Sequence, residues 1–397
     1  MVGIVGKPNT GKSTFFNAAT MASVPTASYP FTTIEPNVGV AYVRRRCVCK
    51  VFDVEDHPQN SLCVEGNRFV PVKIVDTAGL VPGAWEGRGL GNQFLDKIAR
   101  ADALIHLVDI SGGTDLEGNP VAVGSHDPAE DVEFLTDEIV RWFQGIVERD
   151  WPRLVRRARQ EKVAVSDVLY TRLSGLNLTR GQIEDAIDDA GLKSQPPDAW
   201  SDEHFRRFSS TLLGDARPTL VLANKIDIEY SERNLARLRE RGHHVFPASS
   251  VSELVLRRAA EKGYIHYLPG DPDFRIVDSE AMTEKQLKAL DSIRGKVLAR
   301  HGGTGVQSVL DHAVFRTLEM IAAYPVSNAE SLMDGSGNVL PDVFLMQRGS
   351  SVRDLASAIH SDIAQSILYA IDAKTKKRLG PDQVLEDDSV IQIVSAR

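Results

Sequence analysis

With 397 residues, 42% of them hydrophobic and 25% charged, the chain has the composition of a globular protein with more than one core. Its formal net charge of −8 excludes an overall basic field, so any contact with nucleic acid must come from a local patch. An odd number of three cysteines excludes a secreted disulfide scaffold, and no run reaches the roughly 18 apolar residues of a membrane span. We therefore expect a cytoplasmic protein with no membrane contact.

Short apolar runs rich in β-branched residues alternate with helical patterns, which predicts an α/β fold with a doubly wound, mostly parallel sheet. The predicted strands cover residues 2–5, 38–43, 70–75, 103–110, 219–223 and 244–247. The rhythm breaks over residues 127–213, where charged segments with helical spacing predict a helical insertion. We expect the sheet domain to occupy residues 1–126 and, with connecting helices, residues 214–326.

The C-terminal part changes in composition. A stripe of apolar residues from Val306 to Ile321 predicts a helix that ends at Tyr324 and Pro325. Beyond it, short predicted strands at 339–346, 367–371 and 390–394 surround a helix over 352–359 that begins with a capping box at Ser351. Residues 327–397 are therefore predicted to form a small α+β module.

Residues 6–13 (GKPNTGKS) form a phosphate-binding pattern between the predicted strand 2–5 and a helix over 14–22. Glycines let backbone N–H groups turn towards phosphate oxygens, Lys12 reaches the β and γ phosphates, and the Ser13 hydroxyl is a Mg²⁺ ligand. The residues of this segment expected to bind nucleotide are Asn9, Thr10, Gly11, Lys12, Ser13 and Thr14.

Two further segments are expected at the γ phosphate. Residues 76–79 (DTAG) follow a predicted strand, which places the Asp76 carboxylate near Mg²⁺ and leaves Gly79 free to approach the phosphate. In residues 29–39, Thr33, with Thr32 as the alternative, supplies a hydroxyl to Mg²⁺ and an N–H to the γ phosphate. We expect Ser13, Thr33 and Asp76 to hold the metal, and Lys12, Thr33 and Gly79 to act in catalysis.

Residues 224–227 (NKID) favour guanine as the base. They follow the predicted strand 219–223, where the Asp227 carboxylate can accept hydrogen bonds from the ring N–H and the exocyclic amine of guanine. Adenine leaves that carboxylate unpaired, which favours GTP by about 10²-fold. Asn224, Lys225 and Asp227 are therefore predicted to bind the nucleotide at its base, with Ser249 and Ser250 closing over the base; these five residues are called the base segment.

Together these segments resemble the Obg superfamily of translation-factor-class GTPases, most closely the YchF or Obg-like ATPase branch in its archaeal form. The resemblance rests on residues 6–13, on 29–39 (YPFTTIEPNVG), on 76–84 (DTAGLVPGA) and on the glycine-rich 86–95 (EGRGLGNQFL). The region from about residue 327 resembles a TGS domain, a β-grasp module. The resemblance implies a P-loop G domain with a helical insertion, and a ribosome or rRNA partner.

Three features qualify what the resemblance implies. Members of the YchF branch often lack Asn-Lys-x-Asp and prefer ATP, whereas it is intact here, so GTP is favoured and ATP is the alternative. Leu80 stands where many GTPases carry a water-orienting glutamine, which predicts slow turnover within tenfold of ~10⁻³ s⁻¹. Asn9 resembles an asparagine that helps to hold K⁺ in related GTPases; shaping the loop is the alternative role.

Other residues carry weaker signals. Arg88 is interpreted as a solvated or partner-contacting arginine rather than a cis arginine finger, and His106 as a core histidine. Cys47, Cys49, His57 and Cys63 lack the regular paired spacing of a zinc site, so unliganded thiols are favoured and zinc is the alternative.

Basic residues gather in two places. A helical run in the insertion either lies against RNA phosphates or is a solvated face. It consists of Arg153, Arg156, Arg157, Arg159 and Lys162. A second group in the C-terminal module is surrounded by acidic residues, and consists of Lys374, Lys376, Lys377 and Arg378.

The sequence thus predicts an enzyme that hydrolyses GTP to GDP and phosphate with Mg²⁺, as a slow, partner-stimulated switch in translation or ribosome-associated regulation. An ATP-hydrolysing relative, and a binding module that uses nucleotide as a structural ligand, stay open as alternatives.

Overall fold

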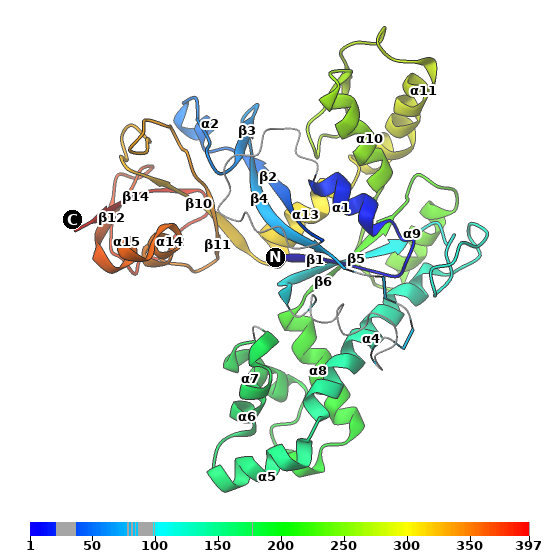
Figure 1. The fold of residues 1–397 in the computed structure, drawn as a ribbon, viewed down its shortest axis with the longest axis vertical. Coiled ribbons are helices and arrows are strands. Elements are labelled where there is room, and N and C mark those ends of the chain that lie inside the picture. Colours follow the sequence, from blue (N-terminus) through cyan, green and yellow to red (C-terminus); the bar gives the residue numbers. More distant parts are fainter. Residues whose placement is uncertain are drawn as a thin grey trace. The chain divides into compact units, whose positions relative to one another are not determined.

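The structure is a computed structural model that describes residues 1–20, 37–77, 79–80, 82–83, 85, 98, 100–176 and 178–396. It divides into two compact units, shown with their elements in Figure 1. Unit 1 comprises residues 1–18, 74–267 and 271–309, and unit 2 comprises 19–73, 268–270 and 310–397. Among the described residues, none of the helices combines the length and the apolar character that a membrane span needs.

Unit 1 is built on a parallel sheet. Its strands are β1 (Val2–Val5), β5 (Ala103–Asp109), β6 (Thr219–Asn224), β7 (Val245–Ala248) and the end of β4 (Asn67–Asp76). β1 lies between β4 and β5, and β6 lies between β5 and β7, all in parallel pairs. Every residue of β1 and β5 is buried, as expected for strands covered on both faces. The predicted parallel sheet is confirmed, and its carboxyl ends share one edge.

Helices that flank this sheet follow directly from strands at that edge. They are α1 (Lys12–Thr20), α9 (Ser231–Glu240) and α10 (Ser250–Glu261). Ser249 caps α10 by accepting a hydrogen bond from the backbone N–H of Ser252. Loops between strand and helix at this edge are where α/β proteins bind ligands.

The insertion is helical and forms an arm of unit 1, the green and teal helices of Figure 1. Its helices are α4 (Pro128–Glu148), α5 (Trp151–Glu161), α6 (Val165–Arg172), α7 (Arg180–Asp189) and α8 (Asp202–Ala216). The arm has a core of its own in which Trp151 stacks on Trp200 at 4.9 Å and meets Phe205 edge-on. The predicted helical insertion is thus present.

The rest of unit 1 is a short helical and strand extension. It contains β8 (Ile265–His266), β9 (Arg275–Ile276), α11 (Glu284–Ile293), a π-helical turn (Arg294–Leu298) and α12 (Ala299–His301). Buried Leu256, Tyr267 and Leu290 join α10 and α11 in one core. The helix α13 (Val306–His312) follows and runs into unit 2.

Unit 2 contains the N-terminal part of β4 and the C-terminal module. β2 (Val38–Arg46) and β3 (Leu62–Val64) neighbour β4, with α2 (Cys49–Phe52) between them in the chain. The C-terminal sheet has the order β11-β10-β14-β12-β13. Its strands are β10 (Met320–Val326), β11 (Phe344–Gln347), β12 (Ile367–Asp372), β13 (Arg378–Leu379) and β14 (Ser389–Ser395).

This C-terminal sheet is covered by α14 (Val352–Ile359), which is followed by the short α15 (Ser361–Ser366). Ser351 and Asp354 form the predicted capping box of α14, and Val352 and Leu355 pack on the strands in a buried cluster. The helix-on-sheet arrangement is that of a β-grasp module.

The sequence-based prediction for residues 306–325 was partly wrong. The helical stripe ends near residue 317, and Tyr324 and Pro325 lie inside β10 rather than after a helix. Alternating Ile321, Ala323 and Pro325 do not discriminate strongly between helix and strand over so few residues. Pro325 is tolerated because β10 pairs with β11 only as far as Ala323. Likewise, the strand predicted at 339–346 is confined to Phe344–Gln347.

Candidate nucleotide-binding site

The phosphate loop links β1 to α1 and needs glycine at two positions. Gly6 and Gly11 have φ of +146° and +95°, which residues with a Cβ rarely adopt. A Cβ on Gly11 would stand 2.4 Å from the Asn224 Nδ2 atom, and one on Gly6 would stand 2.5 Å from the Leu107 carbonyl oxygen. Glycine at these two positions lets the loop backbone pass close to Asn224 and Leu107. The N–H groups of the loop and of the first turn of α1 can then bind an anion together.

Lys12 lies over this loop. Its side chain is buried, and its Nζ atom donates a hydrogen bond of 2.7 Å to the Lys7 carbonyl oxygen. Burial lowers the pKa of Lys12 to about 8, although the nearby Asp76 carboxylate opposes the shift. An anionic phosphate in the loop would raise this pKa again, as the phosphate-binding role predicted for Lys12 requires.

The predicted metal ligands that the structure describes lie together. Ser13, at the start of α1, donates a hydrogen bond of 3.2 Å from its Oγ atom to the Oδ2 atom of Asp76, the last residue of β4. A hydroxyl and a carboxylate at this spacing are the oxygen ligands that Mg²⁺ prefers. Thr32, Thr33 and Arg88 lie outside the described residues.

The segment after β4 runs beside the phosphate loop. Gly79 lies so close to Pro8 that an added Cβ would stand 2.8 Å from its ring. The backbone N–H of Leu80 donates to the Gly6 carbonyl oxygen at 3.2 Å, and the Leu80 side chain is buried against Val5 and Ile98. The side chain of Leu80 is therefore part of the core.

The base segment and the phosphate loop are bonded to each other. Asn224 is buried; its Nδ2 atom donates to the Thr10 carbonyl oxygen at 2.8 Å, and its Oδ1 atom accepts from the Ser250 backbone N–H at 3.0 Å. The Ser249 hydroxyl donates to Asp227 at 2.7 Å and so orients that carboxylate. Asn224 thus positions both segments.

Lys225 also connects the base segment to the phosphate loop. Its φ is +68°, and its Nζ atom donates 2.8 Å hydrogen bonds to the Asn9 carbonyl oxygen and to the buried Asp109 carboxylate. Asp109 ends β5 and also accepts from the Thr114 hydroxyl. Sequence reasoning missed Asp109, although its place at the end of a buried strand was a usable signal.

A buried ion pair also escaped sequence reasoning. The Lys7 Nζ atom lies 2.8 Å from an Asp131 carboxylate oxygen and donates to the Thr114 carbonyl oxygen at 2.9 Å. Both charged side chains are only 2% exposed. Asp131 belongs to the first turn of α4, so this pair ties the phosphate loop to the helical arm.

Two of the weaker sequence interpretations are clarified by their surroundings. Burial, with a smaller effect of the Lys12 and Lys7 charges, lowers the pKa of His106 to about 3, which makes it a neutral core residue. Asn9 has φ of +62°, and its side-chain Nδ2 atom donates to the Gly118 carbonyl oxygen at 2.9 Å. Asn9 therefore contributes to the shape of the loop.

Comparisons with known proteins identify the family of this chain. Residues 1–140 match the family "50S ribosome-binding GTPase", residues 222–328 match "Obg-like GTPase YGR210-like, G4 motif-containing domain", and residues 336–395 match "TGS domain". A GTP-binding protein of Methanocaldococcus jannaschii is 44% identical over 398 residues, covering 100% of this chain and 99% of the relative. The chain belongs to the YchF branch of the Obg-like GTP-binding proteins.

Other members of this family extend the comparison. A solved GTP-binding protein of Pyrococcus horikoshii is 37% identical, covers 100% of this chain and 99% of its own, and superposes with a TM-score of 0.77. The "Ribosome-binding ATPase YchF" of Bacillus subtilis is 29% identical over 77% of this chain and 79% of its own. The family consists of P-loop nucleotide hydrolases, which generally use Mg²⁺. The matches show the predicted GTPase and TGS domains, but β10 (Met320–Val326), which the prediction placed in the G domain, belongs to the C-terminal sheet.

Proposed function

We propose that this protein binds GTP in preference to ATP and hydrolyses it to GDP and phosphate. The main support is the Asn224 side chain, which donates a hydrogen bond to the Thr10 carbonyl oxygen of the phosphate loop and accepts one from the Ser250 N–H of the base segment. It sets the spacing between a phosphate cradle and the Asp227 carboxylate. A site in which both ends are fixed in this way is preorganised for one purine nucleoside triphosphate.

Each end of the site has a separate task. In the phosphate half, backbone N–H groups from Asn9 to Thr14 would bind phosphate oxygens, and Lys12 would exchange the Lys7 carbonyl for the β and γ phosphates. Ser13 and Asp76, with Thr33 as a third ligand, would hold Mg²⁺, which neutralises charge on the phosphate oxygens when bound.

In the base half, Asp227 would accept from guanine while Ser249 holds the carboxylate in place. Hydrolysis then consists of water attacking the γ phosphorus as its bond to the GDP oxygen breaks. Gly79 keeps the approach to that phosphate open. Leu80 has an apolar, buried side chain and offers the attacking water no amide, so we infer slow unassisted turnover.

The hydrolysis itself is tested by phosphate release under single-turnover conditions. Lys12→Ala should abolish GTP-dependent release, because it removes the ammonium that the loop holds at its centre. Lys285→Ala, at an exposed position of α11, is the matched control and should behave as wild type. Equal release by Lys12→Ala and wild type would show that this loop is not the catalytic site.

A second candidate function is ATP hydrolysis. The observation in its favour is the name of the Bacillus subtilis relative, a ribosome-binding ATPase. Against it stands Asp227, because adenine offers no pair of donors to this carboxylate and would leave it desolvated. The preference for one base is a property of the base segment alone, so it can be measured apart from the hydrolysis rate.

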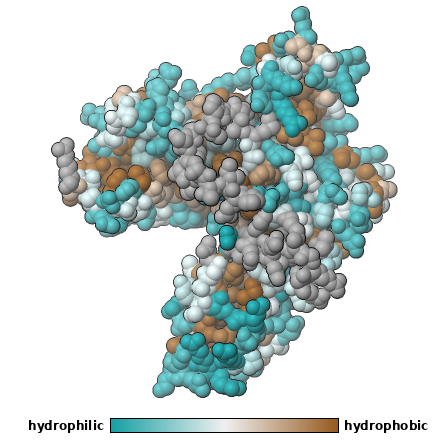
Figure 2. Space-filling model, viewed as in Figure 1, coloured by the Kyte–Doolittle hydropathy of each residue, from teal (hydrophilic) through white to brown (hydrophobic). Residues whose placement is uncertain are grey.

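We further propose a ribosomal or rRNA partner, which the relatives' names support. The helix α5 carries an exposed basic face, and the tip of the arm, where Figure 1 labels α5, is mostly hydrophilic in Figure 2. Arg157 and Arg159 form ion pairs with Glu161 and Asp198 at positions that are largely exposed. Such surface pairs contribute little and can be exchanged for phosphates.

Sedimentation with ribosomes tests this partner. The full-length protein is spun with ribosomes in GDP or in a non-hydrolysable GTP analogue, and we expect more co-sedimentation with the analogue. Arg153→Glu with Arg156→Glu should weaken it more at low salt than at high salt. Arg233→Glu with Arg239→Glu, on exposed positions of α9, is the matched control. Absent or nucleotide-independent co-sedimentation would contradict a ribosomal switch.

A further inference from the structure

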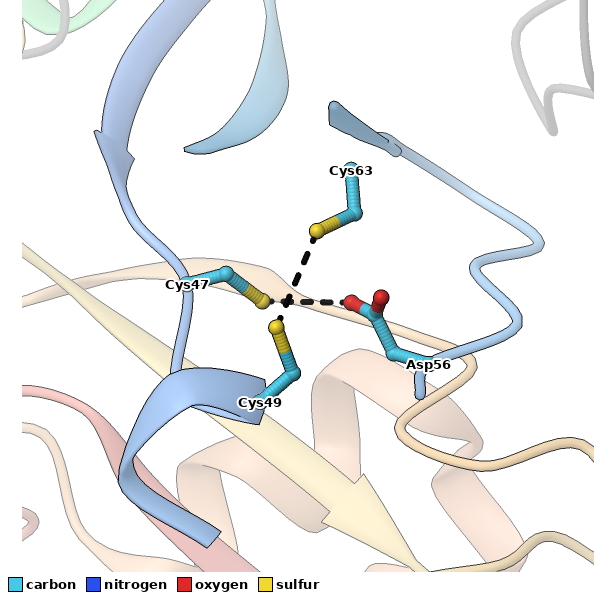
Figure 3. A group of neighbouring side chains, drawn as sticks. All are labelled: Cys47, Cys49, Asp56 and Cys63. Carbon is cyan, nitrogen blue, oxygen red and sulfur yellow. Dashed lines mark hydrogen bonds between the residues drawn. The ribbon is translucent and has the colours of Figure 1, made fainter. Parts of the chain in front are cut away.

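All three cysteines of the chain meet in unit 2, together with one carboxylate. Cys47 follows β2, Cys49 begins α2, and Cys63 lies in β3. Asp56 comes from the loop between α2 and β3. Figure 3 shows their sulfur and oxygen atoms directed towards one another, and the four ligand atoms lie within 4.8 Å of each other.

The spacing of these atoms fits a single tetrahedral ion. Zinc–sulfur bonds of about 2.3 Å place two thiolates about 3.8 Å apart across a tetrahedron. The Sγ atoms of Cys49 and Cys63 are 3.8 Å apart. The Cys47 Sγ atom lies 3.1 Å from an Asp56 oxygen, against about 3.5 Å expected for a thiolate and a carboxylate on one zinc ion. The Cys49–Cys63 distance fits as it stands, the Cys47–Asp56 distance must widen by about 0.4 Å, and the widest pair of ligand atoms, at no more than 4.8 Å, must close by at most about 1 Å.

A buried arginine completes the cluster. Arg68 is fully buried; its Nη1 atom donates to Asp56 at 2.7 Å and its Nη2 atom donates to the Leu340 carbonyl oxygen at 2.7 Å. Three thiolates and a carboxylate around a divalent ion carry a net charge of −2, which this guanidinium partly balances. It also orients Asp56, as partners behind metal ligands commonly do.

His57 is not part of this cluster. Its side chain is exposed, and its backbone N–H donates to the Val339 carbonyl oxygen at 2.8 Å. The zinc alternative considered from the sequence thus changes its fourth ligand from His57 to Asp56. Four protein ligands would fill a tetrahedral ion and leave no position for a substrate, as in structural zinc sites, and Cys47 and Cys49 are buried.

We propose that Cys47, Cys49, Cys63 and Asp56 bind one structural Zn²⁺. The three thiols release their protons to solvent as the ion binds. The ion joins the end of β2 to α2 and β3, and through Asp56 and Arg68 to the segment at Leu340. Its role is to stabilise unit 2, independently of nucleotide hydrolysis.

Metal analysis of protein purified under reducing conditions tests the proposal. Wild type should contain one zinc ion per chain, and Cys49→Ser and Cys63→Ser should each lose it. Asp56→Asn should bind zinc more weakly in competition with a chromogenic chelator, whereas His57→Ala should match wild type. Nucleotide binding by each variant shows that it is folded. Zinc retained by the serine variants, or iron in place of zinc, would overturn the proposal.

Cobalt substitution gives a second readout on the unaltered chain. After removal of zinc by a chelator, added Co²⁺ should give the thiolate-to-cobalt charge-transfer bands of a tetrahedral thiolate site, and Zn²⁺ should abolish them. A Cys49–Cys63 disulfide is the competing outcome, since these sulfur atoms are neighbours. Mass spectrometry that finds this bond in freshly purified protein, with no cobalt bands after reduction, would contradict the zinc site.

Discussion

Replacing Lys7 by methionine should destabilise unit 1 because the buried Asp131 carboxylate loses its lysine partner and keeps His126, 2.8 Å away, as a polar neighbour. Lys7 and Asp131 are both 2% exposed and their charged atoms are 2.8 Å apart, so neither can turn to water. Breaking a buried pair on one side typically costs about 3–5 kcal/mol. This cost of about 3–5 kcal/mol includes the lost hydrogen bond to the Thr114 carbonyl oxygen, because the Lys7 ammonium donates that bond too.

The pH dependence of this loss has a definite sign. Burial raises the pKa of Asp131 even with Lys7 present, so the folded protein holds that proton more tightly than the unfolded chain does. In Lys7→Met the shift should grow, and protonation of Asp131 should then restore stability as the pH falls through the raised value. The Nε2 atom of His126 lies 2.8 Å from an Asp131 oxygen and stays as a polar neighbour of this carboxylate in the variant.

Urea unfolding followed by circular dichroism measures these effects. Lys7→Met and Asp131→Leu should each lose several kcal/mol at neutral pH, and the double variant should recover much of that loss because no charge remains unpaired. GTP affinity should also fall in Lys7→Met, since the pair ties the phosphate loop to α4. A cost under about 1 kcal/mol for Lys7→Met, or strictly additive losses, would refute the reasoning.

Three further predictions concern the phosphate loop. Because burial lowers the pKa of Lys12 to about 8, GTP binding above that pH should take up a proton, and GTP affinity should fall by up to about tenfold per pH unit. Calorimetry in two buffers of different ionisation enthalpy detects the proton. A GTP affinity that does not change with pH would contradict the prediction. Gly11→Ala should lower GTP affinity by about tenfold or more, because the new Cβ would stand 2.4 Å from the Asn224 Nδ2 atom and the backbone has a φ of +95°. Gly214→Ala is the control and should bind GTP normally, because a Cβ there has nothing within 4 Å. If K⁺ assists hydrolysis at Asn9, phosphate release should be faster in K⁺ than in Na⁺, and Asn9→Ala should remove the difference; equal wild-type rates in both salts would exclude this role.

Local patterns predicted most of the fold and the position of the site. The phosphate loop and the residues 224–227 lie at the carboxyl ends of β1 and β6, as their order in the sequence indicated. Partners far apart in the sequence were not predictable: Lys7 and Asp131 are separated by 124 positions, and no periodicity relates them. The bond from the Asn224 side chain to the phosphate loop was not predictable either, because hydrogen-bond partners depend on how strands are juxtaposed.

Two predictions differ from the structure because the local sequence did not decide between alternatives. β10 was read as the end of a helix because a short apolar run fits both periods, and its pairing with β14 decides the conformation. The fourth residue near the cysteines was displaced by one position, from Asp56 to His57, because the direction of a loop side chain is not set by residue type. Both were settled by tertiary contacts.

The most direct test of the account is a competition titration with GTP, ATP and XTP against wild type and Asp227→Asn. Wild type should bind GTP at least about tenfold more tightly than ATP, because Asp227 finds its donors only on guanine. Asp227→Asn should lose about 10²-fold in GTP affinity and gain affinity for XTP, whose carbonyl at C2 can accept from the amide. Equal or reversed affinities of wild type for GTP and ATP would contradict the account.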